Sequence, residues 1–282
     1  MSTLTRRCVL ISVNVKTPAS SRKDSTITNE VLDRHGAGQG SGEWRNKLYH
    51  DDATKPARQA GEAVRAIVVK HGAPWTDGVY IVSAGYLLEL KGKIADAMCV
   101  FSSAATDSAA RFDDWINEAK TRRNGMFNRN EYPVNDMVFR DQFSVKVRYL
   151  PVPDESHVVL DIAEDEVRAI KEQTQEQLFD ASQEAGVKIA SAVAHLVKRM
   201  ADYERDKKAG KKVRMTESLL GNINDMQSLV DVLGCDDTKR EELRVAIADL
   251  VSGGTESLKE CPVARNDKTE KARVLLEKLG AL

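Results

Sequence analysis

The chain has 282 residues, of which 41% are apolar and 30% are charged, and its formal net charge is −1. This apolar content is enough for a core and far below that of membrane proteins, so we expect a soluble protein of one or two domains. Its four cysteines are widely spaced and contain no CxxC pair, which argues against a zinc site or a disulfide framework and favours a reducing cytoplasm. The apolar run at residues 8–15 is too short for a signal sequence or a membrane span.

Residues 1–161 predict an N-terminal α+β part. The β-branched segment 8–16 predicts a strand, and the alternating segment 143–149 predicts a second strand that pairs with it in a small antiparallel sheet. Residues 17–50 are rich in Ser, Thr, Gly and charge, so they predict a long mobile loop. A first long helix is predicted at residues 84–123.

A second long helix is predicted at residues 162–208, where there is no proline and one glycine, Gly186. Small and apolar residues in both long segments recur in steps of three, four and four, which is an 11-residue period with about 3.67 residues per turn. Because the two stripes match, we expect the helices to pack antiparallel on each other. The predicted stripe of the second helix consists of Val167, Ile170, Thr174, Leu178, Ala181, Ala185, Ile189, Ala192, Leu196, Met200 and Tyr203.

The remaining chain predicts a long helix with a basic end at residues 162–214 and a helical C-terminal part at residues 215–282. Cap signals at Thr216, Thr238 and Asp267 mark three shorter helices there. The predicted fold class is therefore mainly α with a small antiparallel β-sheet, built from two long antiparallel helices and a C-terminal helical segment.

Charge is divided along the second long helix. Acidic residues dominate from Glu164 to Glu184 and basic residues from Lys188 to Arg214. One interpretation is complementarity with the helix dipole, supported by ion pairs between neighbouring turns. A second is head-to-tail association of protomers into a ring or filament. A third is a tip that binds nucleic-acid phosphates. The residues of that tip are Lys207, Lys208, Lys211, Lys212 and Arg214.

A second candidate nucleic-acid surface follows the glycine-rich segment 36–42. That segment lacks the GK[ST] ending of a P-loop, so a flexible loop is the better interpretation. Trp44, Arg45 and Tyr49 mix cationic and aromatic side chains, a combination that suits single-stranded nucleic acid. The alternative is that the two aromatic side chains anchor the loop to the fold.

One pattern points to catalysis. Asp77, Glu89 and Lys91 resemble the Asp…Glu-x-Lys spacing of restriction-type nucleases, in which two carboxylates hold Mg²⁺. Those enzymes need the Glu and Lys on a strand, whereas residues 86–94 continue a helical stripe. The five histidines have no metal-ligand spacing and no local nucleophile signature is present, so we expect no catalytic residues, metal or cofactor.

Four segments together resemble a known family. They are Lys55 to Pro74 with Trp75, Tyr132-Pro133, Pro151-Val-Pro153, and Arg214 to Asn224. Their combination resembles a family of phage and proteobacterial proteins classed as a domain of unknown function. Members of that family are often encoded near MoxR-type AAA+ ATPases, so the resemblance implies an adaptor role in phage or mobile-element biology. It supplies no catalytic residues.

These observations favour a non-enzymatic oligomeric or adaptor protein of the cytoplasm, which would be the host cytoplasm if a phage encodes it. The expected partners are a second copy of the chain, single-stranded or duplex DNA, and an AAA+ ATPase, with no membrane. A metal-dependent nuclease of restriction type and a structural particle component are the alternatives.

Overall fold

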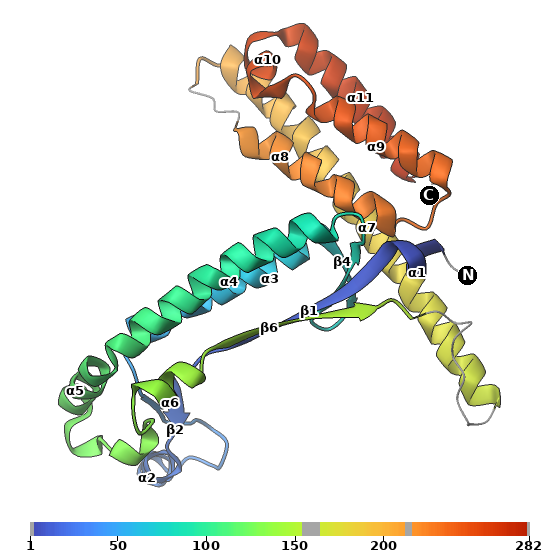
Figure 1. The fold of residues 1–282 in the computed structure, drawn as a ribbon. Coiled ribbons are helices and arrows are strands. Elements are labelled where there is room, and N and C mark those ends of the chain that lie inside the picture. The colour runs from blue at the N-terminus through green and yellow to red at the C-terminus, as the bar shows by residue number, and fades with distance from the viewer. Residues whose placement is uncertain (1–2, 154–163, 212–215, 281–282) are drawn as a thin grey trace. The chain divides into compact units, whose positions relative to one another are not determined.

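The structure is a computed structural model that describes residues 3–153, 164–211 and 216–280 (Figure 1). Helices dominate these residues, accompanied by a four-stranded sheet and a two-stranded sheet. The predicted mainly α fold with a small antiparallel sheet is therefore confirmed. None of the helices in the described residues is both long enough and apolar enough to cross a membrane.

The four-stranded sheet has the order β4-β5-β1-β6, which confirms the predicted pairing of the strands near residues 8–16 and 143–149. Strand β5 pairs antiparallel with both β4 and β1, and Leu10 lies opposite Ile81. Pro74 lies on the outer strand β4, where a missing N–H is tolerated. The strands are β1 (Cys8–Lys16), β2 (Ser21–Lys23), β3 (Arg45–Lys47), β4 (Gly72–Thr76), β5 (Val79–Ser83) and β6 (Ser144–Pro151).

The described helices differ widely in length. The α-helices are α1 (Thr3–Arg7), α2 (Ser25–His35), α3 (Lys55–His71), α4 (Leu87–Ala110), α5 (Phe112–Arg123), α6 (Asp136–Asp141), α7 (Glu164–Lys208), α8 (Glu217–Asp225), α9 (Asp237–Val251), α10 (Gly254–Glu260) and α11 (Pro262–Gly280). Short 3₁₀ helices are η1 (Asp51–Ala53), η2 (Asn124–Met126), η3 (Arg129–Glu131) and η5 (Met226–Val232). The prediction of one long helix at 162–208 is confirmed from Glu164 onward, since residues 162 and 163 lie outside the described residues.

The predicted continuous helix at 84–123 is wrong, because it breaks at Arg111 into α4 and α5. The side chain of Trp115 accounts for the break. Its indole Nε1 donates to the carbonyl of Ser108 at 3.1 Å, the acceptor that Phe112 would use in an uninterrupted helix. The Arg111 guanidinium lies 4.1 Å from the centre of the Trp115 ring, which fixes the indole in this position.

The chain divides into two compact units. Unit 1 comprises Met1–Ser12, Ile67–Lys91 and Arg148–Leu282, and unit 2 comprises Val13–Ala66 and Gly92–Val147. The long helix and the C-terminal helices therefore belong to one unit, together with two N-terminal segments. This division differs from the boundaries that the sequence predicts after residues 161 and 214.

Unit 1 is organised around α7. The stripe of α7 is buried at Leu178, Ala185, Ile189, Leu196 and Met200, as its periodicity predicted. The elements that cover it are α11, α8, η5 and β4, all from the same unit. The prediction that this stripe packs along residues 84–123 is therefore wrong, because the C-terminal helices and the sheet supply the apolar surface that the stripe needs.

Unit 2 contains regular structure where a long mobile loop was predicted at residues 17–50, namely β2, α2 and β3. The polar residues of that segment cap and flank α2. The Asp24 side chain accepts from the backbone N–H of Ile27, and Gly36 ends the helix in the left-handed conformation with φ 62°. Thr28 and Leu32, which lie four residues apart on one face of α2, are buried.

Candidate functional site

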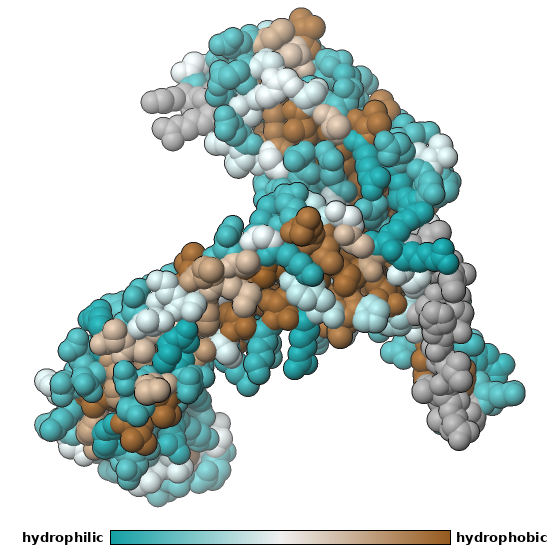
Figure 2. Space-filling model, viewed as in Figure 1, coloured by the Kyte–Doolittle hydropathy of each residue, from teal (hydrophilic) through white to brown (hydrophobic). Residues whose placement is uncertain are grey.

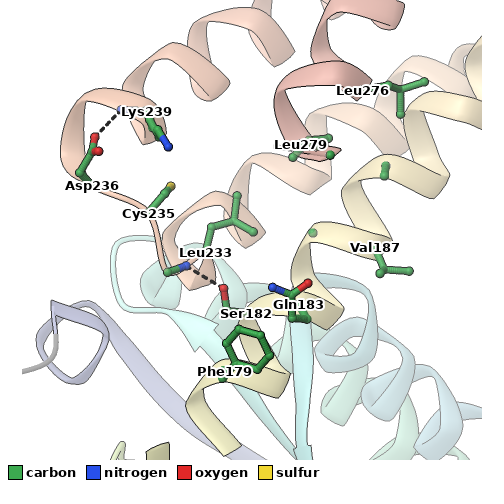
Figure 3. Close-up of a pocket in the computed structure, with 14 residues that line it drawn as sticks. Phe179, Ser182, Gln183, Val187, Leu233, Cys235, Asp236, Lys239, Leu276 and Leu279 are labelled. Atoms are coloured by element: carbon green, nitrogen blue, oxygen red, sulfur yellow. Dashed lines mark hydrogen bonds between the residues drawn. The ribbon is translucent and has the colours of Figure 1, made fainter. Parts of the chain in front are cut away.

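A groove with a volume of about 530 Å³ runs along the middle of α7 in unit 1. Its walls come from α7, from the segment between η5 and α9, and from the end of α11 (Figure 3). We call it the α7 groove and define it by Phe179, Gln183, Val187, Leu233, Leu276 and Leu279.

Two large apolar side chains of the α7 groove are exposed. Phe179 is 63% exposed and Val187 is 57% exposed, whereas Ile189, two residues further on, is fully buried. Phe179 and Val187 are eight residues apart, so they lie about two turns apart on one side of the helix. The helix thus carries a second apolar surface in addition to its core stripe, and such surfaces typically mark interaction sites. Figure 2 shows brown apolar residues reaching the surface of the molecule among teal polar ones.

The groove is built on rigid backbone. Ser182 Oγ of α7 accepts from the backbone N–H of Gly234 at 2.7 Å, which ties the chain after η5 to the long helix. The Asp236 side chain accepts from the N–H of Lys239 at 2.8 Å and caps α9, so the predicted cap at Thr238 is wrong by two residues. Both bonds are drawn in Figure 3. A side chain on Gly186 would meet Leu233 at 3.7 Å, an ordinary packing distance.

The ionisable side chains that line the groove are Cys235, Asp236 and Lys239. Burial raises the pKa of the Cys235 thiol, so the thiol stays protonated at neutral pH and is a poor nucleophile. Asp236 already serves as the helix cap. This combination suits the packing of apolar side chains better than acid–base or nucleophilic chemistry. In the part of the chain that the structure describes, no three His, Cys, Asp or Glu side chains gather to hold a metal ion.

The predicted phosphate-binding tip lies in unit 1 at the end of α7. Lys207 and Lys208 are exposed there, and Lys211 lies 3.9 Å from an Asp206 carboxylate oxygen. Arg205 pairs with Asp202 at 2.9 Å, so acidic side chains offset part of the positive charge. The remaining two predicted residues, Lys212 and Arg214, lie outside the described residues.

The other predicted nucleic-acid residues belong to unit 2. Trp44 is 46% exposed, and its indole N–H donates to Asn46 Oδ1 at 3.0 Å. Arg45 donates to Glu43 at 2.7 Å. Tyr49 is only 2% exposed, and its ring packs against Tyr132 with 5.4 Å between the centroids. The prediction that Tyr49 stacks on bases is therefore wrong, because this ring is part of a core, whereas Trp44 retains an accessible face.

The nuclease pattern does not form the geometry it requires. Asp77 lies between β4 and β5, whereas Glu89 and Lys91 lie on helix α4 and do not alternate along a strand. The hydroxyl of Tyr86 donates to Glu89 at 2.8 Å, and Lys91 Nζ lies 4.7 Å from the centre of the Tyr149 ring. Their contacts account for both charged side chains without a metal site.

The α7 groove was not predicted from the sequence, although one signal was available. Phe179 directly follows the stripe residue Leu178, and Val187 likewise lies outside the 11-residue stripe. Apolar residues outside a stripe that already fills the core indicate a second contact surface. No family model, curated protein or solved structure matches this chain. The resemblance to the phage and proteobacterial family stays a prediction.

Proposed function

We propose that this protein is a non-enzymatic cytoplasmic protein that self-associates through α7 and serves as an oligomeric adaptor. The observation that carries the proposal is the exposed pair Phe179 and Val187 on a helix whose opposite side is already buried. Helices commonly dock in apolar grooves through side chains at such spacings. A second copy of α7 is the occupant that the charges of this helix favour.

The charge argument uses the 11-residue period of the helix. Glu176 and Lys198 each lie 11 residues from Val187, on either side of it, and both are exposed. Eleven residues complete three turns, so all three lie along one line of the helix. If two copies cross antiparallel about a two-fold axis at Val187, Glu176 of each copy lies opposite Lys198 of the other. The acidic and basic halves of α7 then face each other along the contact.

A charge-swap series tests this arrangement. Glu176→Lys and Lys198→Glu should each reduce the dimer fraction, because each single change places like charges opposite each other. The double variant should restore the dimer fraction, because it reverses both partners. The measurement is the mass in solution by sedimentation equilibrium over a range of protein and salt concentrations, since exposed pairs are screened over about 8 Å at physiological ionic strength.

Val187→Glu tests the apolar part of the proposed contact in the same experiment. It should abolish association, because two glutamates would meet at the axis. Val245→Glu is the matched control, since Val245 of α9 is also in unit 1 and is 59% exposed. A monomeric wild-type protein at low salt would overturn the proposal. Equal dimer fractions in the wild type and the two single charge variants would also overturn it. A mass far above that of a dimer would favour the structural particle component instead.

DNA is a second proposed partner, supported by the exposure of Lys207 and Lys208 at the end of α7. Changing Lys207, Lys208 and Lys211 to Ala should lower the salt slope of DNA binding by about 2–3, at roughly 0.7–0.9 per phosphate contact. Fluorescence anisotropy with single-stranded and duplex oligonucleotides measures this slope, with Lys120→Ala in α5 as the control. An unchanged slope would remove DNA from the proposal. An AAA+ ATPase partner and a phage origin are supported by the family resemblance alone.

A further inference from the structure

A second cavity of unit 1, of about 600 Å³, is lined by several guanidinium groups. It lies at the end of α1, beside the turn that follows β5, and along the first two turns of α9. We call it the arginine pocket. Its charged lining residues are Arg6, Arg7, Asp231, Asp237, Arg240, Glu241 and Arg244.

Two of these arginines have hydrogen-bonding capacity that the protein does not use. Arg240 is only 5% exposed, yet its Nη1 has no hydrogen-bond partner among the residues that the structure describes. Nη1 of Arg7 is also buried and has no hydrogen-bond partner among the described residues. A buried donor without an acceptor is destabilising, and a charged donor more so. Because both arginines line the same cavity, their unused donors point to an acceptor that comes from outside the chain.

The two arginines already share one carboxylate. Asp237 Oδ1 lies 2.5 Å from Nη2 of Arg7 and also pairs with Nη2 of Arg240. The Asp237 side chain is 77% exposed, so it can swing into solvent without breaking a packed core. A single carboxylate oxygen held by two guanidinium groups occupies the place that an oxygen of a bound oxyanion would take.

The wall of the pocket is held independently of this pair. Asp231 accepts from Arg244 and from the Ser83 hydroxyl, and its side chain is only 15% exposed. Arg244 also lies 3.6 Å from Glu241. These contacts hold Arg244 against the protein, whereas Arg7 and Arg240 each keep a buried Nη1 with no hydrogen-bond partner among the described residues.

We propose that the arginine pocket binds a phosphate group, with Arg7 and Arg240 as its ligands and Asp237 as the internal group that it displaces. A phosphate has more acceptor oxygens than the one carboxylate oxygen in use, so it can engage Nη1 and Nη2 of both arginines. Such two-pronged contacts are the strong mode of arginine–phosphate recognition. The phosphate can be free or be the ester group of a small molecule.

Phosphate binding is measured by ³¹P NMR line broadening and by titration calorimetry at constant ionic strength, with inorganic phosphate and adenosine 5′-monophosphate as separate probes. Arg240→Gln and Arg7→Gln should each weaken binding by about tenfold or more, because each removes hydrogen bonds to a charged group. Asp237→Ala should tighten binding by about tenfold, because it removes the internal competitor. Arg273→Gln on α11 is the control, since Arg273 is 62% exposed and lies outside the pocket.

The opposite responses of the arginine and aspartate variants make the test specific. A general loss of folding would weaken binding in every variant, so it cannot imitate the gain in Asp237→Ala. Binding of both probes supports recognition of the phosphate group itself, and binding of inorganic phosphate alone identifies the free ion as the ligand. Absence of binding in both the wild type and Asp237→Ala would overturn the proposal. So would equal affinity in the wild type and Arg7→Gln.

Discussion

The two units of this protein bury different kinds of side chain. Aromatic rings make up half of the buried cluster of unit 2, including Tyr49, Tyr132 and Phe139. The buried cluster of unit 1 is aliphatic, and Trp75 and Tyr203 are only partly buried against it. An aromatic cluster concentrates buried area in a few rings, whereas the stripe of α7 spreads it over many small contacts. We therefore expect single substitutions to affect unit 2 more than unit 1.

Side chains of both units donate to backbone carbonyls, and each unit uses both aromatic and cationic donors. In unit 2, the Tyr132 hydroxyl donates to the carbonyl of Leu48 at 3.1 Å, so an aromatic side chain performs this role. In unit 1, Lys188 Nζ donates to the carbonyl of Val69 at 3.0 Å and to that of Gly72 at 2.7 Å. Burial lowers the pKa of Lys188, because it disfavours the charged ammonium form. In unit 2, Arg122 likewise donates to the carbonyl of Leu48 at 3.1 Å, so the two units differ in their buried rings and not in how they satisfy these carbonyls.

The largest effect is expected for Phe139→Ala in unit 2. Phe139 is fully buried, and its ring lies 5.0 Å from that of Tyr49, 5.3 Å from that of Phe112 and 5.2 Å from that of Phe143. Its loss should lower the free energy of unfolding by about 3–5 kcal/mol. Urea denaturation measures the loss, and hydrogen exchange locates it.

The hydrogen-exchange pattern tests whether the core of unit 2 opens separately from the core of unit 1. Protection should fall mainly in Val13–Ala66 and Gly92–Val147. Val100→Ala is the control in the same unit, because Val100 is 61% exposed and should change stability by less than about 0.5 kcal/mol. An equal loss of protection in both units would contradict the distinction between the two cores.

Ile189→Ala is the corresponding change in unit 1. Ile189 is fully buried in the α7 stripe, so its truncation should lower the free energy of unfolding by about 2–5 kcal/mol, toward the lower end if neighbouring aliphatic side chains close the cavity. Val187→Ala, two residues away and exposed, should leave this free energy nearly unchanged while reducing self-association. Similar destabilisation by the two changes would show that Val187 is a core residue and not a contact residue.

The sequence predicted the parts of this fold that depend on local periodicity. The strand at residues 8–16 is confirmed. The stripe from Leu178 to Met200 is confirmed except at Ala192, where the neighbouring Val193 is the buried residue. The break at Arg111 was missed because it results from a hydrogen bond between Trp115 and Ser108, which no apolar period encodes. The buried role of Tyr49 was missed because its ring partners lie more than eighty residues further along the chain.

The candidate sites depend even more on distant residues. The α7 groove needs α11 and the chain after η5 to complete its walls. The arginine pocket joins Arg7 to Asp237, which are 230 positions apart in the sequence. Charge runs are visible in a sequence, and they led to Lys207 and Lys208. Isolated arginines become a site only when the fold brings them together.

The labelling rate of the Cys8 thiol reports how tightly the unit 1 core is closed. Cys8 is 6% exposed, and burial, aided by Asp231, raises its pKa to about 12. At pH 8 its thiolate fraction is therefore about 10³-fold below that of an ordinary cysteine, and labelling by a thiol reagent should be correspondingly slow. Cys99 and Cys261 are exposed and serve as internal controls.

Mass spectrometry of the labelled peptides measures all three rates in one sample. Cys8 labelling should rise about tenfold per pH unit between pH 8 and 10, because the thiolate fraction rises by that factor below the pKa. Ile189→Ala should accelerate it by opening the aliphatic core, whereas Phe139→Ala should leave it unchanged. Equal rates for Cys8 and Cys99 in the wild type would contradict the burial of the thiol. Acceleration by Phe139→Ala would show that the two cores open together, because only a shared opening carries a change in unit 2 to a thiol in unit 1.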